Sequence, residues 1–116
     1  MKKMKKIKAY RQIKVQGKRF KELVEGEYVF NDNLLMYTIK SPRTAVIIDI
    51  RTGISVAYAH TKVEAMKRFK EYEEIYNTIV NNKKYYNKMV EEFNELEEYH
   101  PEVNLDIAES ETEYED

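Results

Sequence analysis

The chain has no cysteine and no tryptophan, and only two prolines and three glycines among 116 residues. The lack of cysteine excludes disulfides, thiolate metal sites and thiol catalysis, and it fits a cytosolic protein. Long apolar runs are lacking too, since no aliphatic run exceeds "AVII" at 45–48. A secretory signal peptide needs an apolar stretch of roughly 7–15 residues and a membrane span needs about 20. We therefore expect a soluble protein of the cytoplasm.

Positive and negative charge are separated along the chain. Ten of the 20 lysines and arginines lie in residues 1–21, which contain no acid. Twelve of the 21 acids lie after residue 90, where there is no lysine or arginine. The net charge of −1 conceals this asymmetry. Such a pattern indicates electrostatic partners and says little about the fold.

The first 60 residues have the pattern of strands and turns. Residues 7–15 alternate apolar and polar side chains with period two, which predicts a half-buried strand, and Gly17 and Gly26 interrupt the segment after it. Further strands are expected at 27–30 and 34–40 around a turn at "NDN", and at 44–50 and 54–60 around "RTG". "SPR" at 41–43 predicts another turn, and Gly53 stands where a three-residue hairpin loop needs a left-handed residue. Because "AVII" is apolar on both faces, we expect 44–50 to be central and covered on one side by a helix.

A helical pattern comes next. Thr61 and Glu64 form a capping box, and Pro101 ends the helical region near Tyr99. The chain is thus predicted to be α+β: an antiparallel sheet of four to five strands covered by one or two C-terminal helices. Residues 1–101 would form one domain with a basic N-terminal arm, and 102–116 an acidic, disordered tail. The apolar stripe of the helical region consists of Ala65, Phe69, Tyr72, Tyr76, Ile79, Tyr86, Val90 and Phe93.

Whether this helical region is one helix or two is left open by "VNNKK" at 80–84, which holds neither glycine nor proline. An unbroken helix would be about 55 Å long at 1.5 Å per residue, too long for one small sheet, and would bury its second half against another copy. A break at Asn81–Asn82 would let the second helix fold back in a monomer. The compact monomer is favoured over the homodimer.

No catalytic or ligand-binding motif is present. His60 and His100 are forty residues apart without a partner motif, and no spacing typical of metal ligands is visible. Asp49 interrupts an apolar strand, where a buried carboxylate would be a catalytic candidate. We favour a structural role in which Asp49 faces solvent or pairs with Arg51. The sequence therefore predicts a protein that is not an enzyme and that has no cofactor and no metal.

The style of the whole chain resembles small phage and mobile-element proteins of low-GC Gram-positive bacteria. The resemblance is carried by the Lys/Asn/Tyr/Glu bias, the hairpin and helix of "IDIRTGISVAYAHTKVEAMKRFKEY", and the acidic end. Some members of that group are anti-CRISPR proteins, which block an effector by presenting carboxylates to a cleft for nucleic acid. The resemblance implies this context and transfers no functional residue.

Two functions are compatible with the charged ends. In the first, the protein inhibits a host nucleic-acid-handling machine, as a DNA mimic whose acidic C-terminal surface binds a basic groove. In the second, it is a small DNA- or RNA-binding regulator that uses its basic arm. The partner-binding residues of the first are Glu91, Glu92, Glu95, Glu98, Tyr99, Glu102, Asp106 and Glu109, and the nucleic-acid-binding residues of the second are Lys2, Lys3, Lys5, Lys6, Lys8 and Arg11.

Overall fold

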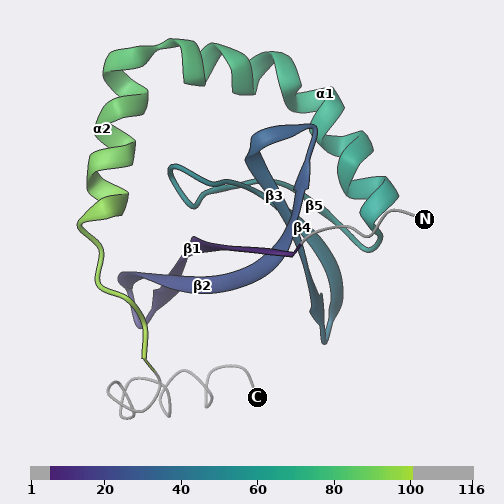
Figure 1. The fold of residues 1–116 in the computed structure, drawn as a ribbon, viewed down its shortest axis with the longest axis horizontal. Coiled ribbons are helices and arrows are strands. Elements are labelled where there is room, and N and C mark those ends of the chain that lie inside the picture. Colours follow the sequence, from purple (N-terminus) through teal and green to yellow (C-terminus); the bar gives the residue numbers. More distant parts are fainter. Residues whose placement is uncertain (1–5, 101–116) are drawn as a thin grey trace.

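The computed structural model describes residues 6–100. Five strands form an antiparallel sheet in the order β1-β2-β3-β4-β5, and two helices come after them in the chain (Figure 1). The α+β fold is therefore confirmed, whereas the acidic tail lies outside the described residues and the domain boundary stays a prediction. The elements are β1 (Ile7–Val15), β2 (Lys18–Val29), β3 (Asn31–Lys40), β4 (Arg43–Asp49), β5 (Ser55–Ala59), α1 (Lys62–Asn81) and α2 (Lys83–Asn94).

Strands β3, β4 and β5 form the centre of the molecule, and α1 covers one of their faces. Alternate residues of these strands point toward α1, as the period of two requires. Phe69 of α1 is fully buried on this face, and its ring meets that of Tyr76 edge-on at 5.5 Å. The core on this side consists of Val29, Leu34, Met36, Ala45, Ile47, Ala57, Ala59, Ala65, Phe69 and Tyr76.

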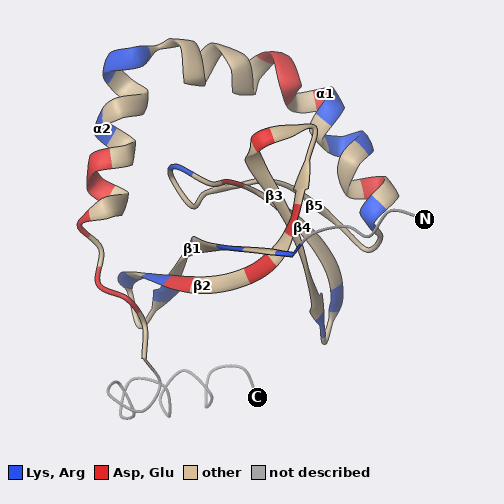
Figure 2. Cartoon of the chain, viewed as in Figure 1, with Lys and Arg blue, Asp and Glu red and all other residues tan. Residues whose placement is uncertain are grey.

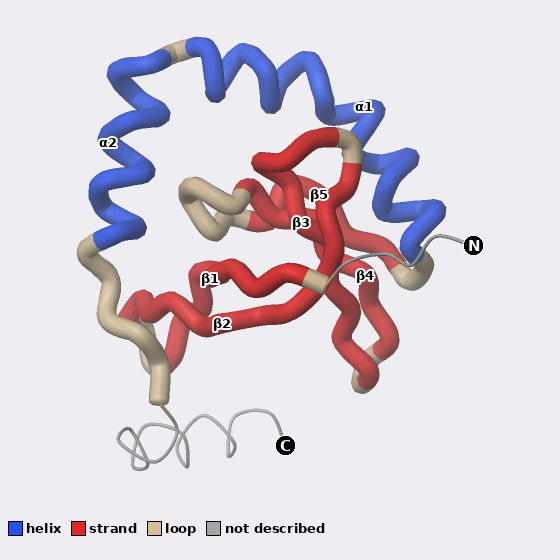
Figure 3. Tube along the Cα trace, viewed as in Figure 1, coloured by secondary structure: helices blue, strands red, loops and turns tan. Residues whose placement is uncertain are grey.

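The other face of β3 and β4 is covered by strands, not by solvent. The hairpin of β1 and the first half of β2 runs across it (Figure 3), so that Ala9 packs with Leu35, Tyr37, Val46 and Ile48. This explains why "AVII" is apolar on both faces. The expected helix lies on one face, and the second apolar layer comes from the N-terminal hairpin.

Strand β2 is longer than the sequence predicts. Its first half pairs with β1 and its last residues pair with β3, on either side of Gly26. A β-carbon at Gly26 would collide with the backbone carbonyl of Met36, so only glycine lets the strand continue there. The glycine that looked like an interruption is therefore a point of close approach inside a strand.

The turns agree with the prediction in two of three places. The "SPR" turn joins β3 to β4, and Gly53 has the expected positive φ of +70° in the loop before β5. The prediction of a turn at "NDN" is wrong, because the chain reverses one residue earlier, at Phe30, whose φ is +68°. Asn31 already belongs to β3, and its side-chain oxygen accepts a hydrogen bond from the backbone of Asn33 at 2.8 Å.

The helical region is broken at Asn82. Thr61 caps α1 by accepting from the backbone of Glu64 at 3.1 Å, as expected of the capping box. Asn82 ends α1 and its side chain caps α2 by accepting from the backbone of Tyr85 at 3.4 Å. Figure 1 shows α2 turning away from α1 and running toward the β1–β2 hairpin. The break is thus settled, but the expected folding back of one helix along the other is wrong.

None of the helices within residues 6–100 has both the length and the apolar character to cross a membrane. The longest of them, α1, has charged residues of both signs at several positions along its length (Figure 2).

Two glycines give a matched test of the packing between the β4–β5 loop and α2. Gly17 and Gly53 both have positive φ, at +81° and +70°, but only at Gly53 would a β-carbon collide with the ring of Phe93. Alanine at Gly17 should cost about 1 kcal/mol through backbone strain alone. At Gly53 it should cost roughly 2–4 kcal/mol, because overpacking adds to the strain. Urea unfolding of the two variants measures this, and equal losses would contradict the proposed contact.

Candidate functional site

The C-terminal end of α2 presents three carboxylates, two in its last turn and one at its C-cap. Tyr86 and Phe93 are buried and turn one side of the helix inward, which leaves Glu91, Glu92 and Glu95 exposed on the other. Within residues 6–100, the side chains of these three glutamates take part in no hydrogen bond or ion pair, and no basic residue stands in the last turn. Figure 2 shows this acidic region at the end of α2. We call Glu91, Glu92 and Glu95 the acidic face.

After α2 the chain runs along β2 as a short parallel strap, residues 97–99. The backbone of Lys21 donates to the carbonyl of Glu97 at 2.9 Å, and the backbone of Tyr99 donates to the carbonyl of Lys21 at 2.8 Å. The Tyr99 ring meets Phe20 edge-on at 5.5 Å. These contacts fix the end of α2, and with it the acidic face, against the N-terminal hairpin.

The strap also joins the acidic end of the chain to the basic one. Glu97 forms an ion pair with Lys18 at 2.8 Å, and this hydrogen bond from Lys18 lowers the pKa of Glu97. Tyr10 donates to Glu98 at 3.1 Å, and this hydrogen bond raises the pKa of Tyr10. Part of the charge separation is therefore used inside the molecule, to hold the strap on the hairpin.

The predicted acidic residues consequently fall into three groups. Glu91, Glu92 and Glu95 are exposed, the first two in the last turn of α2 and the third at its C-cap. Glu98 and Tyr99 are partly buried in the strap, where the hairpin contacts them. The other predicted partner-binding residues, Glu102, Asp106 and Glu109, lie outside the described residues.

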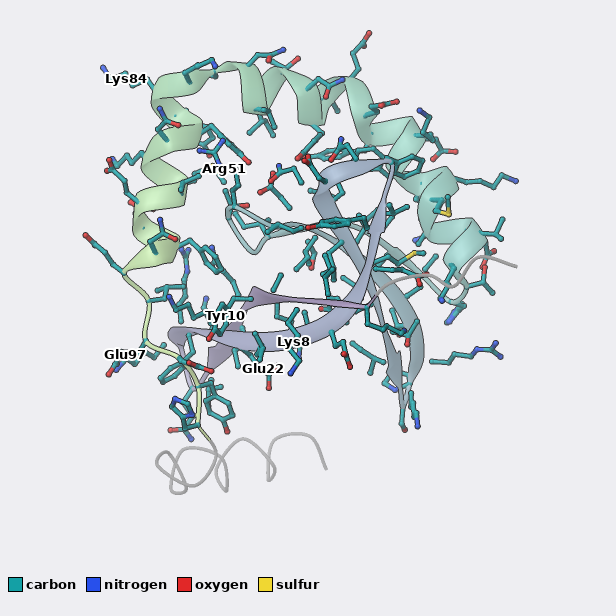
Figure 4. All side chains as sticks on the ribbon, in the orientation of Figure 1. Lys8, Tyr10, Glu22, Arg51, Lys84 and Glu97 are labelled. Atoms are coloured by element: carbon teal, nitrogen blue, oxygen red, sulfur yellow. The ribbon has the colours of Figure 1, made fainter. Side chains whose placement is uncertain are left out.

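The predicted basic residues are also divided. Lys6 and Lys8 are exposed, and Figure 4 shows Lys8 projecting from the β1–β2 hairpin. Arg11 is held within the fold, because its guanidinium donates to Glu22 at 2.7 Å and to the hydroxyl of Tyr37 at 2.8 Å. Burial lowers the pKa of Arg11, but the hydrogen bonds with Tyr37 and Glu22 outweigh it and leave that pKa raised. Lys2, Lys3 and Lys5 lie outside the described residues.

The sequence did not reveal a buried polar cluster around Asp49. Only 2% of Asp49 is exposed, and its carboxylate accepts from the hydroxyls of Tyr76 at 2.7 Å and Tyr86 at 2.8 Å. Asn33 donates to it at 3.1 Å, and so does the backbone of Thr52 at 2.9 Å. The expectation that Asp49 faces solvent or pairs with Arg51 is therefore wrong. We call Asn33, Asp49, Tyr76 and Tyr86 the tyrosine–aspartate cluster.

This cluster joins four parts of the fold at one carboxylate: β3, β4, α1 and α2. Arg51 lies over the ring of Tyr86, 5.1 Å from its centre, and contacts the tyrosine where it was expected to pair with the acid. The sequence does contain a signal for this cluster. Two tyrosines lie in the helical stripe and one acid lies in an apolar strand, and each polar group needs a hydrogen-bond partner once it is buried. The spacing of the residues does not show that these groups are the partners of one another.

Groups that could hold a metal or perform acid–base chemistry are sparse in the described residues. No cluster of three or more His, Asp or Glu suited to a metal ion is found among residues 6–100. His60 lies at the junction of β5 and α1, where its Nδ1 is 3.3 Å from the carbonyl oxygen of Arg43. His100 comes directly after the strap, with its Nε2 3.8 Å from Glu98. The two histidines lie on separate parts of the fold.

The site that the structure assembles is thus a carboxylate row on a firmly held helix end, beside a basic hairpin. Comparison of the chain with protein-family models, with curated proteins and with solved structures gave no match in any of the three.

Proposed function

We propose that this protein is a non-enzymatic inhibitor that binds a nucleic-acid-handling protein of a host cell. The acidic face would occupy a basic groove that normally holds nucleic acid, acting as a DNA mimic in the manner of phage counter-defence or anti-CRISPR proteins. Such a function places the protein in the host cytoplasm. The proposal rests on one observation: Glu91, Glu92 and Glu95 are exposed without an internal partner in the described chain.

The position of these acids supports a use in binding. Negative charge at the C-terminus of a helix opposes the helix dipole, at a cost of a few tenths of a kcal/mol per exposed residue. Stability alone would favour lysine or arginine in this turn. The strap and Phe93 hold the backbone of the helix end in place, so the positions that carry the carboxylates are fixed before a partner arrives, which lowers the entropy cost of binding.

Charge reversal of the acidic face tests the proposal. The variant Glu91→Lys, Glu92→Lys, Glu95→Lys should fail to retain nucleic-acid-binding proteins from a bacterial lysate that the unchanged protein retains at moderate salt. Its fold should be as stable or slightly more so, because lysine complements the helix dipole. Mass spectrometry of the retained proteins, and their release by added duplex DNA, are the two readouts.

A matched control changes the same amount of charge elsewhere. Asp32, Glu71 and Glu74 are exposed on β3 and α1, and lysine at these three positions should leave the retained proteins unchanged. Retention by the acidic-face variant, or capture of no nucleic-acid-binding protein by the unchanged protein, would contradict the proposal.

The alternative is a DNA- or RNA-binding regulator that uses the basic arm. The contacts of Glu97 with Lys18 and of Glu98 with Tyr10 fit an acidic end that competes with nucleic acid for the hairpin. A gel shift with random duplex and single strands distinguishes the two functions. Direct binding that weakens steeply with salt, and strengthens when residues 102–116 are removed, would favour the regulator.

A further inference from the structure

A second charged site lies where β5 joins α1. Here a groove of about 380 Å³ separates the β3–β4 turn from the start of α1. Lys40 and Arg43 flank the turn on one side, and His60 and Lys62 stand on the other. The complete lining is Thr38, Ile39, Lys40, Arg43, Thr44, Ala45, His60, Thr61 and Lys62. We call this the cationic groove.

The groove exists because the β3–β4 hairpin extends past the first turn of α1. Met36 and Ala45 belong to the core beneath α1. Side chains an even number of residues apart on a strand point to the same face, and Lys40 is four residues after Met36 on β3 while Arg43 is two residues before Ala45 on β4. Lys40 and Arg43 therefore lie on the α1 side of the hairpin, beyond the point where the helix begins. No helix covers them in the described chain, and their charged side chains line the open side of the groove.

Two like charges face each other on this side of the groove. Lys40 and Arg43 are direct cross-strand partners, an arrangement that destabilises a sheet when the charges have no counter-ion. Neither residue forms an ion pair within residues 6–100, and no acid is among the residues lining the groove. Lys62 pairs with Glu27 at 3.3 Å, but about half of its side chain stays exposed. The groove thus holds an excess of positive charge.

The walls of the groove are tied in place by hydrogen bonds. Thr44 donates to the carbonyl of Pro42 at 3.1 Å, and Thr61 is engaged with Glu64 as the cap of α1. His60 Nδ1 lies 3.3 Å from the carbonyl oxygen of Arg43 and links the junction to the hairpin. The hydroxyl groups of Thr44 and Thr61 therefore already have hydrogen-bond partners, and the charged groups of the lining are the ones available to a ligand.

We propose that the cationic groove binds a phosphate monoester. A dianion would neutralise Lys40 and Arg43 together, and the guanidinium of Arg43 can hold two of its oxygens at once. Lys62, which is paired with Glu27, stands on the opposite wall. The groove accommodates a phosphate on a small molecule or at the end of an oligonucleotide, since these share the same terminal group. This site is independent of the acidic face on α2.

Calorimetric titration with inorganic phosphate at constant ionic strength tests the proposal. Arg43→Gln and Lys40→Gln should each weaken binding about tenfold or more, because each variant removes a charged donor to the phosphate. Both variants should unfold at the same temperature as the unchanged protein or higher, because the cross-strand repulsion is relieved. Weak binding would then not be attributable to misfolding.

The control is Lys84→Gln, which removes the same charge from the exposed start of α2 (Figure 4) and should change phosphate affinity less than twofold. A 5′-phosphorylated oligonucleotide should bind and its unphosphorylated form should not. If a phosphorylated small molecule binds and the phosphorylated oligonucleotide does not, the ligand of the groove is a small phosphate ester. Equal binding of the two oligonucleotides, an equal effect of Lys84→Gln, or no binding of phosphate would overturn the site. None of these results depends on the acidic face, so the two proposals fail separately.

Discussion

Replacing Asp49 with alanine should destabilise the domain by about 3–5 kcal/mol, since buried donors that lose a charged acceptor cost about 1–3 kcal/mol each. The carboxylate accepts from the hydroxyls of Tyr76 and Tyr86, from Asn33 and from the backbone of Thr52. Alanine leaves the buried hydroxyls of Tyr76 and Tyr86 without this acceptor. The loss would be a large part of a total stability of roughly 5–15 kcal/mol.

Urea unfolding measures the effect, and Asp32→Ala is the matched control. Asp32 is an exposed aspartate on β3, so its loss changes the charge equally and should shift stability by less than about 0.5 kcal/mol. Tyr86→Phe should fall between the two, because it removes one of the donors and leaves Asp49 with the others. If Asp49→Ala cost no more than Asp32→Ala, the cluster would not hold the fold together.

Raising the pH from about 10 to 12 should progressively destabilise the protein, with both cluster tyrosines responsible. Burial raises the pKa of Tyr86 to about 12, and burial together with the hydrogen bond to Asp49 raises the pKa of Tyr76 above its ordinary value. An unfolded tyrosine ionises near pH 10. The tyrosines' contribution to stability is therefore complete below pH 10 and is lost as the pH rises toward their folded pKa values.

The sign is set by the protons bound in each state. Between pH 10 and 12 the unfolded chain has released these two protons and the folded chain retains them, so the free energy of unfolding falls as pH rises. Each tyrosine contributes a slope of up to about 1.4 kcal/mol per pH unit.

Urea unfolding at several pH values, monitored by circular dichroism, measures this slope. The double variant Tyr76→Phe, Tyr86→Phe should start less stable at pH 8 but lose less stability between pH 10 and 12. Tyr58→Phe is the control, because Tyr58 is 60% exposed and should leave the slope unchanged. An unchanged slope in the double variant would show that other groups cause the alkaline loss.

The candidate site was only partly predictable. Glu91, Glu92 and Glu95 can be placed from the sequence alone, because the helical period that buries Phe93 turns them outward. The involvement of Glu97 and Glu98 with the basic hairpin cannot. No local pattern indicates that Glu97 binds Lys18, 79 residues away, or that Glu98 binds Tyr10, 88 residues away. The cationic groove was equally hidden, since its two sides come from a strand turn and a helix start that meet only in the folded chain.

By itself the sequence determined the features that depend on near neighbours. Strand β1 is specified by alternation, the start of α1 by the Thr61–Glu64 cap, and the positive φ of Gly53 by its hairpin loop. Each depends on residues within one turn or one pleat of one another. A local pattern of that kind is sufficient to specify such an element.

Only the tertiary structure decided where the pieces meet. Asp49 is 27 residues from Tyr76 and 37 from Tyr86. The three come together because burial removes water from each polar group, which then needs a hydrogen-bond partner within the protein. Gly26 lets β2 continue because the carbonyl of Met36 occupies the space that a side chain would need. The direction of α2 after Asn82 is set in the same way, by Tyr86 on Asp49 and Phe93 against Gly53. These contacts join distant segments, and no period or propensity in the chain encodes them.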